Sequence, residues 1–284
     1  MARSPLSSAQ RARAVVAQRL RELMEDAGIS AREAARRCDW HESKSSRLLS
    51  GTTPPSESDI RLWCAACGAD SQTADLIAAS KAAESSYASW SRIQREGLRQ
   101  SQRQYIPLYE RTKVIRVYTS TVIPGLLQTP DYAAALMSAI VDYRGIVNDV
   151  DAAVAARVER SKVVNDGRHR CVFLIEESVL RNRFGDVGTM TAQLGSLLTI
   201  LGKPNVVLGI IPSGSQRDQG MWTVETFMIF DEAEVQVELL AAFVTVTVPS
   251  EIRSYESAFS RFGSMAVYGR DATKLITAAI EALG

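Results

Sequence analysis

Hydrophobic side chains recur at helical spacing near the N-terminus. Apolar residues from Val16 to Ala27 stand at offsets of 0, 4, 7, 8 and 11, which is the spacing of one buried helix face. Gly28 follows as a stop for that helix. Ser30 and Glu33 then form an S-x-x-E capping box, which predicts the start of a second helix that runs to about residue 38.

A third helix is predicted from Glu42 to Ser50, after a tight connection of residues 38–41. It is polar except for Leu48 and Leu49, so we expect Ser45 and Leu48 to point inward and the remaining Ser, Lys and Arg side chains to be exposed. Short helices joined by a turn of three to four residues, with a polar helix after the turn, are the helix-turn-helix arrangement.

Two more helices complete the N-terminal part. A fourth begins at the cap Ser56, with Asp59 three residues on, and ends at Gly68. A fifth, alanine-rich helix is expected over residues 71–85. We therefore predict an all-α, five-helix, lambda-repressor-like domain over residues 1–86.

The rest of the chain alternates between short runs of branched residues and helical runs. We predict a larger α+β domain over residues 87–284, which begins with a polar linker helix that contains Trp90, Ile93, Leu98 and Tyr105. The strands after residue 205 follow one another closely, so we expect an antiparallel sheet. The expected strands are residues 113–118, 171–176, 206–211, 226–230, 235–240 and 243–248, and the expected helices are residues 130–140, 151–164, 187–201, 250–262 and 271–283.

Composition supports two ordinary globular domains. The chain has 284 residues, of which 46% are hydrophobic and 23% charged, and this length leaves room for a small domain and a larger one. No apolar run is long enough for a secretory signal or for a membrane-spanning helix. These features predict a cytoplasmic protein without a membrane segment.

The distribution of charged residues along the chain is more informative than the net charge. The net charge is +1, yet residues 1–47 carry ten Lys or Arg against six Asp or Glu. Such a surplus suits a surface that faces phosphates, although a solvated helix face would give the same count. The major groove of B-DNA admits one α-helix that exposes short polar side chains, and the predicted third helix meets that need.

Four segments of the N-terminal part carry a family resemblance. They resemble the phage-repressor-type XRE family of helix-turn-helix regulators, in its actinobacterial form, and they are Gly28-Ile-Ser-Ala-Arg-Glu-Ala-Ala35, Trp40-His-Glu-Ser-Lys-Ser-Ser-Arg-Leu48, Ser50-Gly51 and Pro55-Ser-Glu-Ser-Asp-Ile60. In that pattern a Gly precedes the Trp and a Ser caps the third helix, whereas Asp39 and His41 stand here. Asp tolerates a left-handed backbone. His41 is a poorer cap than Ser, so either its ring contacts DNA or the helix begins frayed.

The resemblance implies sequence-specific binding to an operator in double-stranded DNA, with roles for matching positions. The candidates for base edges or nearby phosphates are His41, Glu42, Ser43, Lys44 and Arg47, with Ser46 between these roles, and the candidates for phosphate contacts are Ser30, Ala31, Arg32, Thr52 and Thr53.

Four segments of the larger domain resemble the DUF5753 domain, namely residues 122–133, 175–180, 190–194 and 206–212. That domain follows an XRE reader in many actinobacterial regulators. The resemblance implies an antitoxin-like regulator whose partner is a small DUF397 protein, so the leading hypothesis is a transcription regulator modulated through its C-terminal domain. Because one helix reads only a few base pairs, we also expect a homodimer on two half-sites.

An alternative hypothesis makes the larger domain a small-molecule sensor, with Trp222, Phe227 and Tyr118 around a pocket. Around the helix at Pro130, we expect Leu126 and Leu127 to be core residues and Gln128 with Thr129 to cap the helix.

No enzyme motif, cofactor site or metal site is predicted. Glu176 and Glu177 are adjacent at a strand end and point to opposite faces, so they are a poor acid and base pair. Arg157, Glu159 and Arg160 are expected to form surface ion pairs. The chain contains no phosphate-binding glycine loop, His169 stands in a turn, and Cys64 and Cys67 lack two further zinc ligands.

Overall fold

The computed structural model describes residues 8–82, 87–94, 97–218 and 220–284. It divides into two compact units, one of residues 1–87 with 245–252 and one of residues 88–244 with 253–284. The domain boundary predicted between residues 86 and 87 stays a prediction, because residues 83–86 lie outside the described part. Each unit is therefore described by itself.

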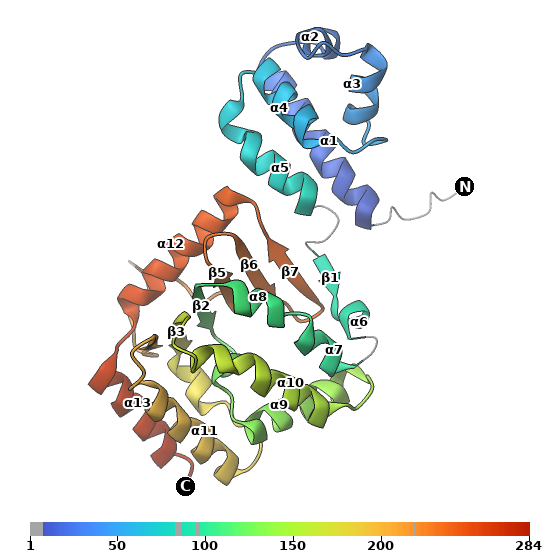
Figure 1. Ribbon diagram of the computed structural model, residues 1–284. Coiled ribbons are helices and arrows are strands. Elements are labelled where there is room, and N and C mark those ends of the chain that lie inside the picture. The colour runs from blue at the N-terminus through green and yellow to red at the C-terminus, as the bar shows by residue number, and fades with distance from the viewer. Residues whose placement is uncertain (1–7, 83–86, 95–96, 219) are drawn as a thin grey trace. The chain divides into compact units, whose positions relative to one another are not determined.

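The first unit is helical, as predicted (Figure 1). Its centre is Trp63, which is fully buried, stacks on Trp40 with ring centroids 5.7 Å apart and donates its indole N–H to the carbonyl oxygen of Leu20 at 3.0 Å. Its helices are α1 (Ser8–Asp26), α2 (Ala31–Arg37), α3 (Glu42–Leu49), α4 (Glu57–Ala66), a 3-10 turn η1 (Asp70–Gln72) and α5 (Thr73–Ala82).

The second unit is built on one mixed sheet, so the α+β prediction is confirmed. The strand order is β1-β7-β6-β5-β2-β3-β4. The strands are β1 (Tyr87–Ser89), β2 (Val114–Thr119), β3 (Arg170–Glu176), β4 (Val206–Ile211), β5 (Phe227–Phe230), β6 (Glu234–Glu238) and β7 (Ala242–Val246).

Strand direction differs between the two halves of the sheet. β5 pairs antiparallel with β2 and with β6, as expected for strands after residue 205. β4 departs from that expectation, because it pairs parallel with β3, which in turn pairs parallel with β2. The cause is α11 (Val187–Ile200), a crossover helix that returns the chain to the end of the sheet from which β3 started.

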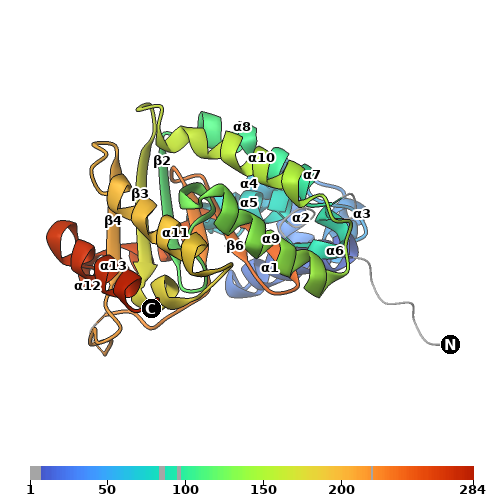
Figure 2. The same ribbon diagram turned by 90° about the horizontal axis from the view of Figure 1, so that it is seen from below.

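Helices cover both faces of the sheet (Figure 2). One face carries the main core, to which α8, α9, α11 and α13 contribute. On the other face α12 places Phe262 against Tyr118, with ring centroids 3.9 Å apart. The remaining bounds are α8 (Ile106–Arg111), η2 (Gly125–Leu127), α9 (Pro130–Arg144), α10 (Val150–Ser161), η3 (Lys162–Val164), η4 (Glu177–Arg181), α12 (Pro249–Met265) and α13 (Gly269–Glu281).

The predicted linker helix is broken into short pieces. Before α8, the chain forms α6 (Trp90–Ile93) and α7 (Leu98–Arg103). The break lies at Gly97, whose φ is 95°, and an added Cβ there would lie 2.5 Å from the Oδ2 atom of Asp149. The same carboxylate accepts the N–H groups of Leu98 and Arg99 at 2.8 and 2.9 Å. The start of α7 is therefore stabilised by a side chain that comes about fifty residues later in the chain.

Candidate nucleic-acid interface

The turn between α2 and α3 has the backbone that the sequence predicted. Asp39 has a φ of 56°, in the left-handed region that the family pattern fills with Gly. Ser30 caps α2 by accepting the N–H of Glu33 at 3.2 Å. The other half of the expected capping box is not formed, because the Glu33 carboxylate instead pairs with Arg36 and Arg37 at 2.8 and 2.9 Å. These arginines lower the pKa of Glu33 to about 2.

His41 is the N-cap of α3. Its backbone is extended, with φ −70° and ψ 140°, and its Nδ1 atom accepts the N–H of Ser43 at 3.4 Å. A side chain therefore caps the start of the helix, and the alternative of a frayed start need not be invoked.

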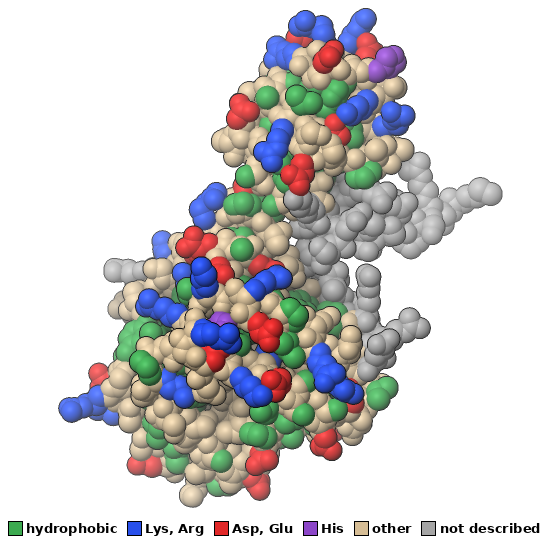
Figure 3. Space-filling view, in the orientation of Figure 1, with side chains coloured by type: hydrophobic (Ala, Val, Ile, Leu, Met, Phe, Trp, Pro, Cys, Tyr) green, Lys and Arg blue, Asp and Glu red, His purple; other side chains and the backbone are tan. Residues whose placement is uncertain are grey.

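α3 has one inward and one outward face, as predicted. Ser45 and Leu48 are buried, and the Ser45 hydroxyl donates to the carbonyl oxygen of Glu42 at 2.9 Å. The side chains exposed along the outer edge are Glu42, Ser43, Ser46 and Arg47. Lys and Arg side chains gather over α2 and α3 in the space-filling view (Figure 3).

Lys44 is placed differently from its neighbours on α3. Its ammonium group lies 2.5 Å from the Oδ1 atom of Asp59 and 4.3 Å from the centroid of the Trp40 ring. Asp59 also caps α4 by accepting the N–H of Ser56 at 3.0 Å. Burial raises the pKa of Asp59, but bonds from Lys44 and Ser56 outweigh burial and lower it overall. Lys44 thus fastens α3 to α4.

The other basic candidates separate into paired and unpaired groups. Arg32 forms an ion pair with Glu42 at 2.9 Å, and this pair joins the start of α2 to the start of α3 at the surface. Arg47 is exposed and forms no ion pair within the described residues. Its carbonyl oxygen accepts the N–H groups of Thr52 and Thr53 at 3.0 and 3.2 Å. The loop candidates are therefore held at the end of α3, and both are exposed.

Much of the positive charge counted in this part of the sequence is used internally. Arg19 pairs with Glu22 at 2.7 Å, and Arg21 donates to the carbonyl oxygen of Leu49 at 2.5 Å. Arg37 donates to the carbonyl oxygen of Ala66 at 2.9 Å. Sequence reasoning missed these roles, because the charge count does not reveal which carbonyl lies nearby. Ser30 and Arg32 are exposed at the start of α2, where Ala31 is half-buried.

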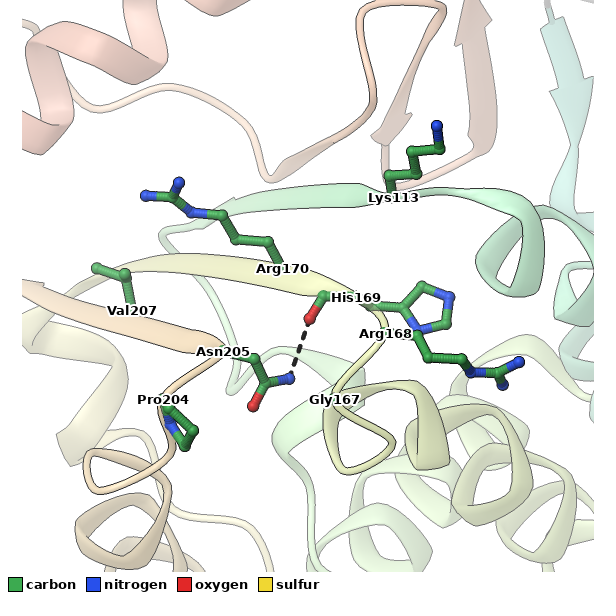
Figure 4. A pocket seen from close by; sticks show the side chains of 8 residues that line it. All are labelled: Lys113, Gly167, Arg168, His169, Arg170, Pro204, Asn205 and Val207. Atoms are coloured by element: carbon green, nitrogen blue, oxygen red, sulfur yellow. Dashed lines mark hydrogen bonds between the residues drawn. The ribbon is translucent and has the colours of Figure 1, made fainter.

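A second basic surface lies in the larger unit. A hollow of about 350 Å³ is lined by Lys113, Arg168, His169 and Arg170 at the starts of β2 and β3. The charged ends of Lys113, Arg168 and Arg170 point in different directions (Figure 4). His169 stands in the bend before β3, as the sequence indicated, but its side chain is buried and its Nδ1 atom lies 2.8 Å from the Oδ1 atom of Asp166. This hollow therefore lacks cations that converge on one anion.

Two expectations for the larger unit are wrong. Arg160 was expected in a surface ion pair, but its side chain is buried on α10. The sensor alternative placed Trp222 with Tyr118 and Phe227, but Trp222 is 69% exposed while the other two rings pack in the core, 5.4 Å apart.

The two adjacent glutamates do point apart. Glu176 is buried and lies 2.6 Å from Arg217 and 2.9 Å from the Tyr118 hydroxyl, whereas Glu177 accepts the N–H of Ser213 at 2.9 Å. No group of His, Cys, Asp and Glu suited to a metal ion occurs among the described residues. Among the same residues, no helix is long and apolar enough to cross a membrane.

Two family models match the chain. One, described as a helix-turn-helix domain (HTH_31), matches residues 15–77 and covers α2 and α3. The other, described as a domain of unknown function (DUF5753), matches residues 102–278, which is more than half of the chain. No curated protein and no solved structure matches the chain significantly.

Proposed function

The chain belongs to the DUF5753 family and carries a helix-turn-helix domain, and on that premise we propose a sequence-specific regulator of transcription that reads its operator with α3. The supporting observation is the division of α3 into two faces. Ser45, Leu48 and Lys44 attach the helix to the unit, while Ser43, Ser46 and Arg47 are exposed along one edge. A helix held in this way can lie in the major groove without rearrangement.

Within this proposal the exposed residues have separate tasks. Arg47 contacts a base edge, because a free guanidinium forms two parallel hydrogen bonds with guanine. Ser43 and Ser46 contact bases or nearby phosphates. Arg32 and the threonines after α3 contact phosphates, which position the protein without reading sequence. Glu42 modulates this surface through its pair with Arg32.

We also propose that the regulator acts as a cytoplasmic homodimer. One recognition helix reads only a few base pairs, so specificity for one operator requires two half-sites about one turn of DNA apart. In this arrangement the operator is palindromic, because it mirrors the two-fold axis of the dimer.

The larger unit is proposed to control when the reader binds. The family resemblance favours a small DUF397-like partner protein, as in a toxin and antitoxin-like pair. The alternative is a one-component sensor of a small molecule, which is supported by an arginine-lined cavity in this unit. We propose no catalytic role, since the buried Glu176 is already occupied by Arg217 and Tyr118.

A genome-wide binding profile of the full chain tests this proposal. The expected result is a set of sharp peaks that share one palindromic motif, with half-site centres about 10 base pairs apart. A matched profile of Arg47→Ala should show weaker peaks, whose shared motif loses its preference at about one base pair of each half-site. Binding spread evenly over the genome, with no shared motif, would contradict the proposal. Co-purification with a small neighbouring gene product separates the partner version from the sensor version.

A further inference from the structure

The larger unit contains a cavity of about 410 Å³ between the sheet and the helical layer. Its floor is formed by Val117, Met228 and Gln236, which are direct neighbours across β2, β5 and β6. Its walls come from α7, α8, α9 and α10 and from the turn at Gly125. Cavities of this size, walled by several elements, are where proteins hold small organic molecules.

Three arginines line this cavity, against one acidic residue, the exposed Glu238. Arg160 is only 8% exposed, and its Nε atom is a buried donor without a hydrogen-bond partner in the part of the chain that the structure describes. Its guanidinium carbon lies 4.9 Å from the centroid of the Tyr109 ring. A buried, unsatisfied donor on a charged group is costly, so a native protein keeps one where something else satisfies it.

Arg157 and Arg144 have neutral partners. Arg157 donates to the side-chain oxygens of Gln128 and Gln102 at 2.5 and 3.2 Å. Arg144 donates to the side-chain oxygen of Gln94 at 2.6 Å. None of the ion pairs formed by the described residues involves an arginine of this cavity. The amides orient the guanidinium groups without neutralising them, and the charge remains available to an anion.

Arg157 and Arg160 converge on one place. A Cβ added to Gly125 would lie 3.2 Å from the Nη2 atom of Arg160 and 3.8 Å from the Cζ atom of Arg157. Burial and, after it, the nearby charge of Arg160 lower the pKa of Arg157 to about 10, although Glu238 acts in the opposite direction. Two cations that crowd one poorly solvated place repel each other until an anion lies between them.

Apolar and aromatic side chains form a large part of the remaining lining. Leu98, Leu136 and Ile140 come from the helices, and Tyr105 and Phe243 lie 5.3 Å apart between ring centroids. Such a wall binds a flat ring or a short apolar chain by burial of surface area and by aromatic contacts.

We propose that this cavity binds a small organic anion, whose carboxylate or phosphate group is held by Arg157 and Arg160 and whose apolar, ring-bearing body lies against the aromatic side chains. Carboxylate and phosphate ligands of this kind share one feature, an oxyanion attached to an apolar body. Binding at this site needs no DNA. A failure of this inference would therefore leave the proposed operator binding untouched, and the reverse also holds.

The test is calorimetric titration of the full chain with three naphthalene probes that are substituted at the same ring position: naphthoate, naphthyl phosphate and naphthamide. The expected result is that at least one of the two anions binds at least about tenfold more tightly than the neutral amide, since a charge-assisted, bidentate contact contributes that much. The stronger of the two anions identifies the carboxylate or the phosphate as the preferred group.

Variants of the arginines locate the binding. Arg160→Met and Arg157→Met should each weaken binding of the preferred anion at least about tenfold while leaving the weak binding of naphthamide unchanged. Arg168→Met, which removes an exposed arginine of the basic hollow, is the matched control and should change nothing. Circular dichroism shows whether each variant is folded, and if Arg160→Met is not, Arg157→Met alone decides.

Three outcomes would overturn the inference. They are equal affinity for the amide and both anions, unchanged anion affinity in a folded arginine variant, and no binding of any probe at millimolar concentration. A loss of affinity in Arg168→Met equal to that in Arg160→Met would also overturn it, because the effect would then reflect general charge rather than this cavity.

Discussion

Arg47 on α3 and Arg160 on α10 both lack a carboxylate partner among the described residues, but their surroundings differ. Arg47 is exposed, so water solvates its charge at little cost until a polyanion arrives. Arg160 is buried in the helical layer, and none of the described residues offers its Nε atom a hydrogen-bond partner. An unpaired charge at the surface is compatible with an extended polyanionic ligand such as DNA. An unpaired charge inside a cavity instead implies a small ligand of matching shape and charge.

The two units also differ in what their paired charges do. In the first unit, pairs such as Lys44 with Asp59 join one helix to the next. In the second unit, Arg157 is held by neutral glutamines and keeps its net charge. Lys44, which serves the fold, has a carboxylate partner, whereas Arg47 and Arg160, which are assigned to ligands, have none among the described residues.

The largest expected effect comes from removing the centre of the first unit. Trp63→Ala deletes the ring that stacks on Trp40 and its hydrogen bond to Leu20. The free energy of unfolding of that unit should fall by about 3–5 kcal/mol, and operator binding should be lost with it. Urea denaturation followed by circular dichroism measures the change. Trp222→Ala is the matched control, because Trp222 is 69% exposed and its loss should cost less than about 0.5 kcal/mol.

The next effect separates reading from positioning. Arg47→Ala should weaken operator binding by about 1–3 kcal/mol and relax the preference at about one base pair. Arg32→Ala should weaken binding to all sequences alike, because phosphate contacts carry no sequence information. Gel shifts on cognate and scrambled duplexes distinguish the two patterns. If both variants bind the cognate duplex as the wild type does, the DNA-contacting surface has been assigned wrongly.

A smaller effect of opposite sign is expected inside the second unit. Without ligand, Arg160→Met should raise the free energy of unfolding by about 1 kcal/mol, because removal of an unsatisfied buried donor outweighs the lost contact with Tyr109. Thermal melting in ligand-free buffer measures this gain. The same change at Arg47 should leave the melting temperature nearly constant. A destabilised Arg160→Met protein would show that the charge serves the fold, and the comparison between the two arginines would fail.

The smallest effect concerns acid. The pKa of Asp59 is lowered in the folded protein, so this carboxylate contributes stability above its ordinary pKa and loses it as the pH falls through the lowered value. Asp59→Asn should therefore lower the free energy of unfolding at neutral pH by about 0.5–1 kcal/mol. The difference from the wild type should shrink to nothing in acid. Urea titrations across that range, with Glu25→Gln on α1 as an exposed control, would reveal a constant difference if the interpretation is wrong.

The first unit was largely predictable because its signals are local. Ser30, His41 and Ser56 each start a helix within a few residues of their own position, and the spacing of apolar residues identifies the buried faces. The bond of Lys44 to Asp59 was not foreseen, since Asp59 comes fifteen residues later on another helix. No local pattern encodes that contact.

The second unit depends on distant contacts, and less of it was predictable. The break at Gly97 depends on Asp149, and the direction of β4 depends on the path of α11. For Arg160, however, a signal was available. On α10 the buried Val150, Ala153 and Arg160 stand at offsets of 0, 3 and 10, which belong to one helix face. A charged residue on an apolar stripe was a reason to expect burial.

The most direct test of the central claim is the ratio of two dissociation constants, measured by fluorescence anisotropy at one physiological salt concentration. The two ligands are the duplex recovered from the binding profile and a scrambled duplex of equal length. The wild-type chain should bind the recovered duplex at least about a thousandfold more tightly, and Arg47→Ala should lower that ratio. Equal affinity for the two duplexes would contradict a sequence-specific reader built on α3.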